Sequence, residues 1–197
     1  MTLYKILLPI ARVLVKSVGC RVEGAHNVPA EGSCIVASNH VTVCDPVFLA
    51  CAMPGRVLHF MGKQSLFDIP VLGWLFAKCG GFPVSRGEGD VSAIRYSVSL
   101  LREGKVLAIF PEGTRSGTGE LNKAFDGVGL IAEKSKAPVI PVRIMKVRGR
   151  KKGFRGRTRI MIGDPLYLEA MDMPENKRER RTYIAAAIME SISMLGG

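Results

Sequence analysis

The sequence predicts a single α/β domain whose sheet is mixed but largely parallel and is covered by helices. Short runs of β-branched residues alternate with helical patterns along most of the chain, and this alternation is typical of parallel sheets. The 197 residues are 47% hydrophobic, which suffices for one domain with a substantial core. No internal repeat or low-complexity linker divides them, so we expect one domain.

Residues 3–18 (LYKILLPIARVLVKSV) predict an N-terminal amphipathic helix that contacts a membrane. On a helix, Lys5, Arg12 and Lys16 fall within about 40° of one another, and the rest of the circumference is almost entirely apolar. A narrow basic stripe on a wide apolar surface suits a helix that lies in the bilayer interface. The alternative is a helix packed on the protein's own core with its stripe facing water.

The remaining elements follow in order after this interfacial helix (1–19) and make up the main domain (20–197). Apolar runs rich in β-branched residues predict strands over 33–38, 56–61, 81–84, 106–110, 139–144 and 157–162. Helical patterns predict helices over 46–52, 71–78, 91–102, 125–136 and 175–195. The last of these is amphipathic, and it could close the core, line the membrane or pair with another subunit.

Neither a conventional membrane span nor a disulfide framework is predicted. No stretch of 18 uncharged residues occurs, so no segment reads as a spanning helix. The five cysteines form no CxxC pair, and one would be left over if the others paired. We therefore expect reduced thiols in a cytosolic setting.

Polar residues gather at three of the predicted strand ends. In sheets of this kind, ligands bind where strands end and the next helix begins. The three segments are 38–46 (SNHVTVCDP), 80–87 (GGFPVSRG) and 110–116 (FPEGTRS). We therefore expect the residues that bind or react with a substrate to lie in these loops.

The first of these loops contains a candidate general base. His40 and Asp45 are close enough across a strand-to-helix turn for the carboxylate to hold the imidazole and raise its basicity. The alternative is that Asp45 caps a helix beginning at Pro46. No convincing nucleophile accompanies the pair, because Cys44 adjoins an acid and is interpreted as a small core residue. His40 would then activate a hydroxyl of the substrate.

The other two loops contain charged residues suited to an anionic substrate. Arg86 and Arg115 lie beside small or turn-forming residues, and guanidinium groups match phosphate geometry. The alternative is two solvated surface arginines. Glu112 follows an apolar strand directly, so it either pairs with Arg115 or hydrogen-bonds to substrate hydroxyls.

No metal or nucleotide cofactor is expected. The three histidines show no metal-ligand spacing. The sequence contains neither a GxxxxGK[ST] phosphate loop nor a complete GxGxxG motif.

Four ordered segments resemble the motifs of the lysophospholipid/glycerolipid acyltransferase family, in particular those of the bacterial 1-acyl-glycerol-3-phosphate acyltransferases. They are Asn39-His40 with Asp45-Pro46, Gly81-Phe82-Pro83-Val84-Ser85-Arg86, Phe110-Pro111-Glu112-Gly113-Thr114-Arg115-Ser116, and Ala137-Pro138-Val139-Ile140-Pro141-Val142. The stretch from Gly62 to Trp74 resembles a further part of the family. The resemblance covers about residues 20–168, which would make 20–197 the acyltransferase domain.

The resemblance implies a direct transfer with no acyl-enzyme intermediate. His40, oriented by Asp45, would deprotonate the free hydroxyl of lysophosphatidic acid. That hydroxyl would attack the thioester of acyl-CoA or acyl-ACP and give phosphatidic acid in phospholipid biosynthesis. The residues implied to bind the phosphate and to shape the glycerol pocket are Arg86, Glu112, Gly113, Thr114 and Arg115.

The resemblance leaves the acceptor open. Members of the family also act on glycerol 3-phosphate, on other lysophospholipids or on lyso-aminolipids. Many relatives have a basic residue shortly before the glycine of the helix that follows the third motif. Here Asp126 precedes Gly127, and Lys123 is the nearest basic residue. This departure concerns the part of the motif that would distinguish the headgroup of the acceptor lipid.

Residues 146–159 contain eight Lys and Arg residues and no acid, which is most of the net charge of +11. Near an anionic bilayer each such residue contributes about 1 kcal/mol. With residues 3–18, this segment predicts a peripheral protein on the cytoplasmic face of the cell membrane. A solvated loop, or a loop that docks acidic ACP, is the alternative.

Two non-catalytic classes remain as alternatives: a membrane scaffold and a nucleic-acid-binding module. The basic segment contains a single aromatic residue, Phe154, and no recognition motif, so nucleic acid is not an expected partner.

Overall fold

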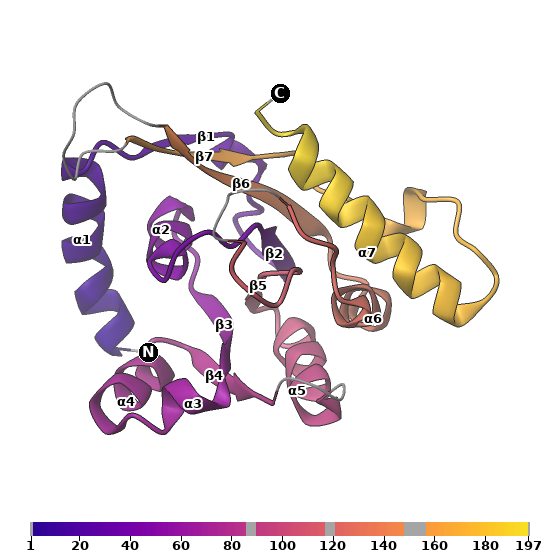
Figure 1. The fold of residues 1–197 in the computed structure, drawn as a ribbon, viewed down its shortest axis with the longest axis horizontal. Helices are drawn as coiled ribbons and strands as arrows, with labels where there is room; N and C mark the ends of the chain where they lie inside the picture. Colours follow the sequence, from indigo (N-terminus) through magenta and orange to yellow (C-terminus); the bar gives the residue numbers. More distant parts are fainter. Residues whose placement is uncertain (1, 86–89, 117–120, 148–156, 197) are drawn as a thin grey trace.

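The strands form one sheet in the order β1-β7-β6-β2-β5-β3-β4 (Figure 1). They belong to a computed structural model that describes residues 2–85, 90–116, 121–147 and 157–196. All neighbours pair in parallel except β6 and β7. The strands are β1 (Arg21–Glu23), β2 (Cys34–Ser38), β3 (Leu58–Lys63), β4 (Gly81–Val84), β5 (Val106–Ile109), β6 (Val139–Val147) and β7 (Arg157–Ile162). The predicted α/β domain with a largely parallel sheet is confirmed.

Helices cover both faces of this sheet. They are α1 (Thr2–Ser17), α2 (Asp45–Ala52), α3 (Gln64–Phe67), α4 (Pro70–Lys78), α5 (Val91–Arg102), α6 (Asp126–Ser135) and α7 (Lys177–Met194), with short 3-10 turns at Ala25–Asn27 and Leu168–Ala170. The core on one face includes side chains of α1, α2 and α4, and the core on the other includes side chains of α5, α6 and α7. The molecule therefore has three layers, and α7 closes the second core.

Strand periodicity distributes the apolar residues between the two cores. In β2, Val36 packs on the side of α1 and α2, whereas Ile35 and Ala37 pack on the side of α5 to α7. Successive side chains of a strand point to opposite faces. Because all three residues are apolar and fully buried, β2 reads as a continuous hydrophobic run, as buried parallel strands do.

The register of the parallel strands brings the three polar loops to one edge of the sheet. Ala37 pairs with Ile109, so β2 and β5 end side by side. Phe60 pairs with both Ala108 of β5 and Gly81 of β4, so β3 and β4 end at the same edge. The loops after β2 and β5 consequently leave the sheet as neighbours.

Helix α1 lies beside α2, with Tyr4 buried in the core. Lys5 and Lys16 are exposed, but Arg12 is half-buried and donates a 3.0 Å hydrogen bond to the carbonyl of Met53 at the end of α2. The three predicted stripe residues therefore do not share one environment.

Among the described residues, no helix has the length and apolar character needed to cross a membrane.

Asp90 caps the N-terminus of α5. Its carboxylate accepts hydrogen bonds from the Ser92 hydroxyl at 2.5 Å and from the backbone N–H groups of Ser85 and Ala93 at 2.8 and 3.0 Å. The Ser92 hydroxyl and these amides lower the pKa of Asp90 from 3.8 to about 2. Since Ser85 follows β4, this cap also joins the end of β4 to the start of α5.

We predict that the cap stabilises the protein only when Asp90 is ionised. A carboxyl whose pKa is lower in the folded state stabilises above its unfolded pKa and loses that effect as the pH falls through its folded pKa. The difference in free energy of unfolding between wild type and Asp90→Asn should therefore be constant above pH 5 and shrink between about pH 4 and pH 2. Urea unfolding across this range measures it. A difference that does not vary with pH would contradict the assignment.

Candidate active site

The structure brings His40 and Asp45 together at the end of β2. His40 Nδ1 donates to Asp45 Oδ2 at 2.9 Å. The His40 side chain is 14% exposed, while the carboxylate beneath it is buried. With Nδ1 occupied by the carboxylate, Nε2 is the ring nitrogen left for a substrate.

The turn between these two residues is built around the Asp45 carboxylate. It accepts hydrogen bonds from the backbone N–H groups of Val41 and Thr42 at 2.6 and 2.7 Å, and from the Thr42 hydroxyl at 2.7 Å. Burial raises the pKa of Asp45, but the hydrogen bonds from His40, Thr42 and Val41 outweigh it, so the pKa lies below its ordinary value. Asp45 is therefore held as a carboxylate.

Two interpretations of this turn need correction. The N-cap of α2 is Cys44, and the Asp45 carboxylate points back to the preceding loop instead of capping the helix. Cys44 is exposed, so its interpretation as a small core residue is wrong.

The loop after β5 holds the backbone of His40 on both sides. Glu112 Oε1 accepts from the His40 N–H at 3.0 Å, and the His40 carbonyl accepts from the Ser116 N–H at 2.9 Å. Phe110 stacks on the imidazole with ring centroids 4.1 Å apart and planes at 17°. The loop 110–116 thus sets both the position of His40 and the plane of its ring.

The Glu112 carboxylate links the loop after β2 to the segment around Asn122, and we call this link the Glu112 clasp. Glu112 is 2% exposed, and its second oxygen accepts from the backbone N–H and the side-chain amide of Asn122, both at 3.0 Å. From its place after an apolar strand, we expected Glu112 either to pair with Arg115 or to hydrogen-bond to substrate hydroxyls. In the structure its oxygens meet backbone and amide donors instead, so the negative charge is buried but satisfied.

The next residues of this loop face outward. Gly113 has φ 65°, and a Cβ there would lie 2.6 Å from the Phe125 ring, so only glycine fits without strain. Thr114 and Arg115 are exposed. Arg86, which was predicted to share the phosphate, lies outside the described residues.

Asn39 has a structural role that was not predicted from the sequence. Its side chain accepts from the Ile144 N–H at 2.7 Å and donates to the Ile144 carbonyl at 3.0 Å. It thereby ties the end of β2 to β6. The sequence signal for this role was the position of Asn39 directly before His40. The stacking of Phe110 on His40 was likewise signalled only by its position at the start of the loop 110–116.

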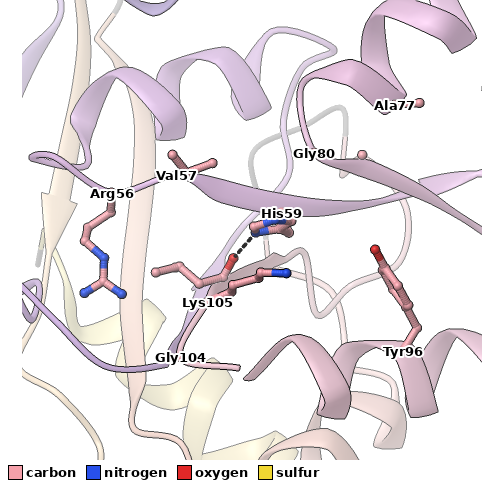
Figure 2. Close-up of a pocket in the computed structure, with 10 residues that line it drawn as sticks. Arg56, Val57, His59, Ala77, Gly80, Tyr96, Gly104 and Lys105 are labelled. Atoms are coloured by element: carbon pink, nitrogen blue, oxygen red, sulfur yellow. Dashed lines mark hydrogen bonds between the residues drawn. The ribbon is translucent and has the colours of Figure 1, made fainter. Parts of the chain in front are cut away.

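A cavity of about 470 Å³ lies elsewhere, at the amino ends of β3 and β5 (Figure 2). Its polar side chains already join parts of the fold. Arg56 donates to the carbonyls of Pro29 and Gly32, and the His59 ring hydrogen-bonds to the Val106 carbonyl at 3.2 Å. Burial lowers the pKa of His59. The candidate site is therefore at the opposite edge of the sheet, around His40.

The described residues contain no group of three or more His, Cys, Asp or Glu side chains that could hold a metal ion. The chemistry available at the candidate site is that of an imidazole held by a carboxylate, with an exposed arginine on the neighbouring loop.

A family model named Acyltransferase matches residues 19–145. The chain belongs to the acyltransferase family. A 1-acyl-sn-glycerol-3-phosphate acyltransferase of Bacillus subtilis is 32% identical over 150 residues, which are 76% of this chain and 74% of that protein. A lyso-ornithine lipid O-acyltransferase of Pseudomonas aeruginosa is 30% identical over 175 residues, covering 77% of this chain and 66% of that protein. The family resemblance is confirmed.

The fold is also that of a solved acyltransferase. The 1-acyl-sn-glycerophosphate (LPA) acyltransferase PlsC of Thermotoga maritima superposes with a TM-score of 0.73 at 23% sequence identity, over 96% of this chain and 80% of that one. Some relatives are much longer: this chain matches 46% of a chloroplast 1-acyl-sn-glycerol-3-phosphate acyltransferase of Brassica napus.

We predict that Glu112→Ala destabilises the protein by about 1–3 kcal/mol, because it removes the buried acceptor of the part-buried His40 and Asn122 N–H donors. The measurement is the midpoint of urea unfolding. Glu103→Ala is the matched control. The Glu103 side chain is exposed, and among the described residues its carboxylate contacts Lys105 and accepts a long hydrogen bond from the Ser99 hydroxyl at 3.4 Å. This variant should change stability by less than about 0.5 kcal/mol. Equal midpoints for the two variants would rule out the clasp.

Proposed function

We propose that this protein transfers a fatty acyl group from acyl-CoA or acyl-ACP to the free hydroxyl of lysophosphatidic acid. The observation that carries the proposal is the His40–Asp45 pair at 2.9 Å, fixed at a sheet edge where its outer nitrogen can reach a substrate. The Bacillus subtilis relative, a 1-acyl-sn-glycerol-3-phosphate acyltransferase, supports the choice of acceptor.

In the proposed reaction, His40 Nε2 takes the proton of the acceptor hydroxyl as its oxygen bonds to the thioester carbonyl carbon. Asp45 keeps Nδ1 protonated and stabilises the imidazolium that forms. When the tetrahedral intermediate collapses, the carbon–sulfur bond breaks and His40 returns the proton to the departing thiolate. The products are an ester and a free thiol, and the imidazole is neutral again.

The loop 110–116 would bind the acceptor. Arg115 is exposed on the loop that holds His40, where its guanidinium suits a phosphate monoester. Gly113 keeps its backbone accessible at a positive φ, and Thr114 adds an exposed hydroxyl. Arg86, outside the described residues, would complete the phosphate site from the loop after β4.

Lyso-ornithine lipid is a second candidate acceptor. It is favoured by the Pseudomonas aeruginosa relative, whose identity to this chain is close to that of the Bacillus subtilis protein. The chemistry at His40 would be the same, since either acceptor offers a free hydroxyl.

We place the protein at the cytoplasmic face of the cell membrane as a peripheral protein. Support comes from α1, whose outward face exposes four large apolar side chains: Ile6, Ile10, Val13 and Leu14. The basic segment 146–159 would add electrostatic attraction to anionic lipid; its residues 148–156 lie outside the described ones.

The first test is acyl transfer by the purified protein. We expect ester formation from lysophosphatidic acid with acyl-CoA or acyl-ACP, and the two donors are compared directly. His40→Ala should lower the rate by about 10²–10⁴-fold, the usual contribution of a general base. Glycerol 3-phosphate and lyso-ornithine lipid are offered in parallel. An unchanged rate in the variant would exclude His40 as the base. Transfer only to glycerol 3-phosphate or only to lyso-ornithine lipid would identify that compound, instead of lysophosphatidic acid, as the acceptor.

A second test concerns the phosphate. Arg115→Ala should raise KM for lysophosphatidic acid by about tenfold or more and leave KM for the acyl donor within about twofold, because a charge-assisted hydrogen bond to the acceptor is lost. Arg102→Ala, an exposed arginine at the end of α5, is the control and should change neither. Equal effects of Arg115→Ala on donor and acceptor would contradict this role.

A further inference from the structure

The hairpin of α3 and α4 exposes a second apolar surface. Its outward side chains are Leu66, Ile69, Val71, Leu72 and Trp74, all exposed. Val71 is 78% exposed and Trp74 58%. Large apolar side chains gathered in this way on a protein surface mark an interaction site.

This surface belongs to a hairpin that is already docked. The Phe76 ring packs against the sheet over Gly81, where a Cβ would lie 2.3 Å from it, and it contacts Phe67 with ring centroids 5.4 Å apart. In α4 the inner face is thus occupied by Phe76 and the buried Gly73. The exposed residues are the outer face of a packed element, and they have no place left in the core.

Charge favours a lipid bilayer as the partner of this surface. The hairpin contains one acid, Asp68, whose carboxylate accepts from the Gln64 amide at 3.2 Å, and the exposed Lys63 and Lys78 flank the apolar side chains, so the surface keeps a net positive charge. An anionic membrane complements such a surface, with apolar residues in the lipid and lysines at the headgroups.

The position of the hairpin agrees with a membrane partner. In Figure 1, α1 and α4 lie at the same end of the molecule, and α6 and α7 lie at the other. Helix α3 follows directly on β3, whose carboxyl end lies at the same edge of the sheet as His40. A bilayer that accepts α4 would therefore lie next to the edge where the acceptor reacts.

We propose that the α3–α4 hairpin, Gln64 to Lys78, is a second membrane-contacting element, with Trp74 at the bilayer interface and Val71 and Leu72 in contact with acyl chains. This goes beyond contact through α1 and the basic segment, and it rests on the proposed function for its lipid acceptor. It concerns binding alone, so it can be tested without catalysis.

Trp74 is the only tryptophan in the sequence, so its fluorescence reports on this hairpin directly. The probe is a vesicle of phosphatidylglycerol and phosphatidylcholine with no substrate. We expect the emission to shift to shorter wavelength on binding and to be quenched by phospholipids brominated on the acyl chain. Vesicle binding without a change in Trp74 emission, or no binding at low salt, would overturn the proposal.

Val71→Asp is the matching variant, and Val91→Asp on α5 is its control, because Val91 is also exposed (58%) but lies on the other face of the sheet. We expect Val71→Asp to weaken vesicle binding by about tenfold or more and Val91→Asp to change it by less than about twofold. If Val71→Asp instead converts a dimer to a monomer and leaves vesicle binding intact, the surface binds a second copy and the proposal fails.

The same variants separate this proposal from the proposed function. A lysophosphatidic acid with a short acyl chain, used below its micelle concentration, is an acceptor in free solution. Val71→Asp should transfer acyl groups to it within about twofold of the wild-type rate. Normal membrane insertion without transfer to this acceptor would refute the proposed function only, and transfer without insertion would refute the hairpin's role only.

Discussion

The candidate site depends on the hydrogen bonds that hold the backbone of His40 to the loop after β5. The His40 N–H is bonded to Glu112 and its carbonyl to Ser116, so the residue is fixed from both sides. These bonds are possible because β2 and β5 pair in parallel with Ala37 opposite Ile109, which makes the two loops leave the sheet together. The imidazole then needs only Asp45 and Phe110 to set its tautomer and its plane.

The same arrangement explains why two acidic residues in one small site have different tasks. Asp45 accepts from the ring of His40 and from the turn beside it, so it acts on the chemistry of the imidazole. Glu112 accepts from the backbone of His40 and from Asn122, so it acts on the position of the residue. Both carboxylates are buried and hydrogen-bonded, and neither of them occupies the outer ring nitrogen of His40.

Much of this could be predicted from the sequence, because strand periodicity and turn residues are local signals. His40 and Asp45 are five positions apart and lie within one such signal. The partner of Glu112 is 72 positions away along the chain, and a backbone N–H leaves no trace in the residue types. Strand β1 and helix α3 were missed because three and four residues are too few to show a period.

The two helical layers differ in the side chains that they expose on their outer faces. Helix α7 buries Ile184, Ile188 and Ile192 and begins with the charged sequence KRERR, as a helix facing water does. Helices α1 and α4 instead present several large apolar side chains outward, and because each is already partly covered, its further burial would contribute less than the about 1.5–3 kcal/mol of a fully exposed side chain. That gain requires an apolar phase outside the protein. The lysolipid acceptor proposed above would reside in a bilayer, which would supply such a phase, so under this proposal the layer of α1 and α4 is the one that would bring the loops at the strand ends to the acceptor.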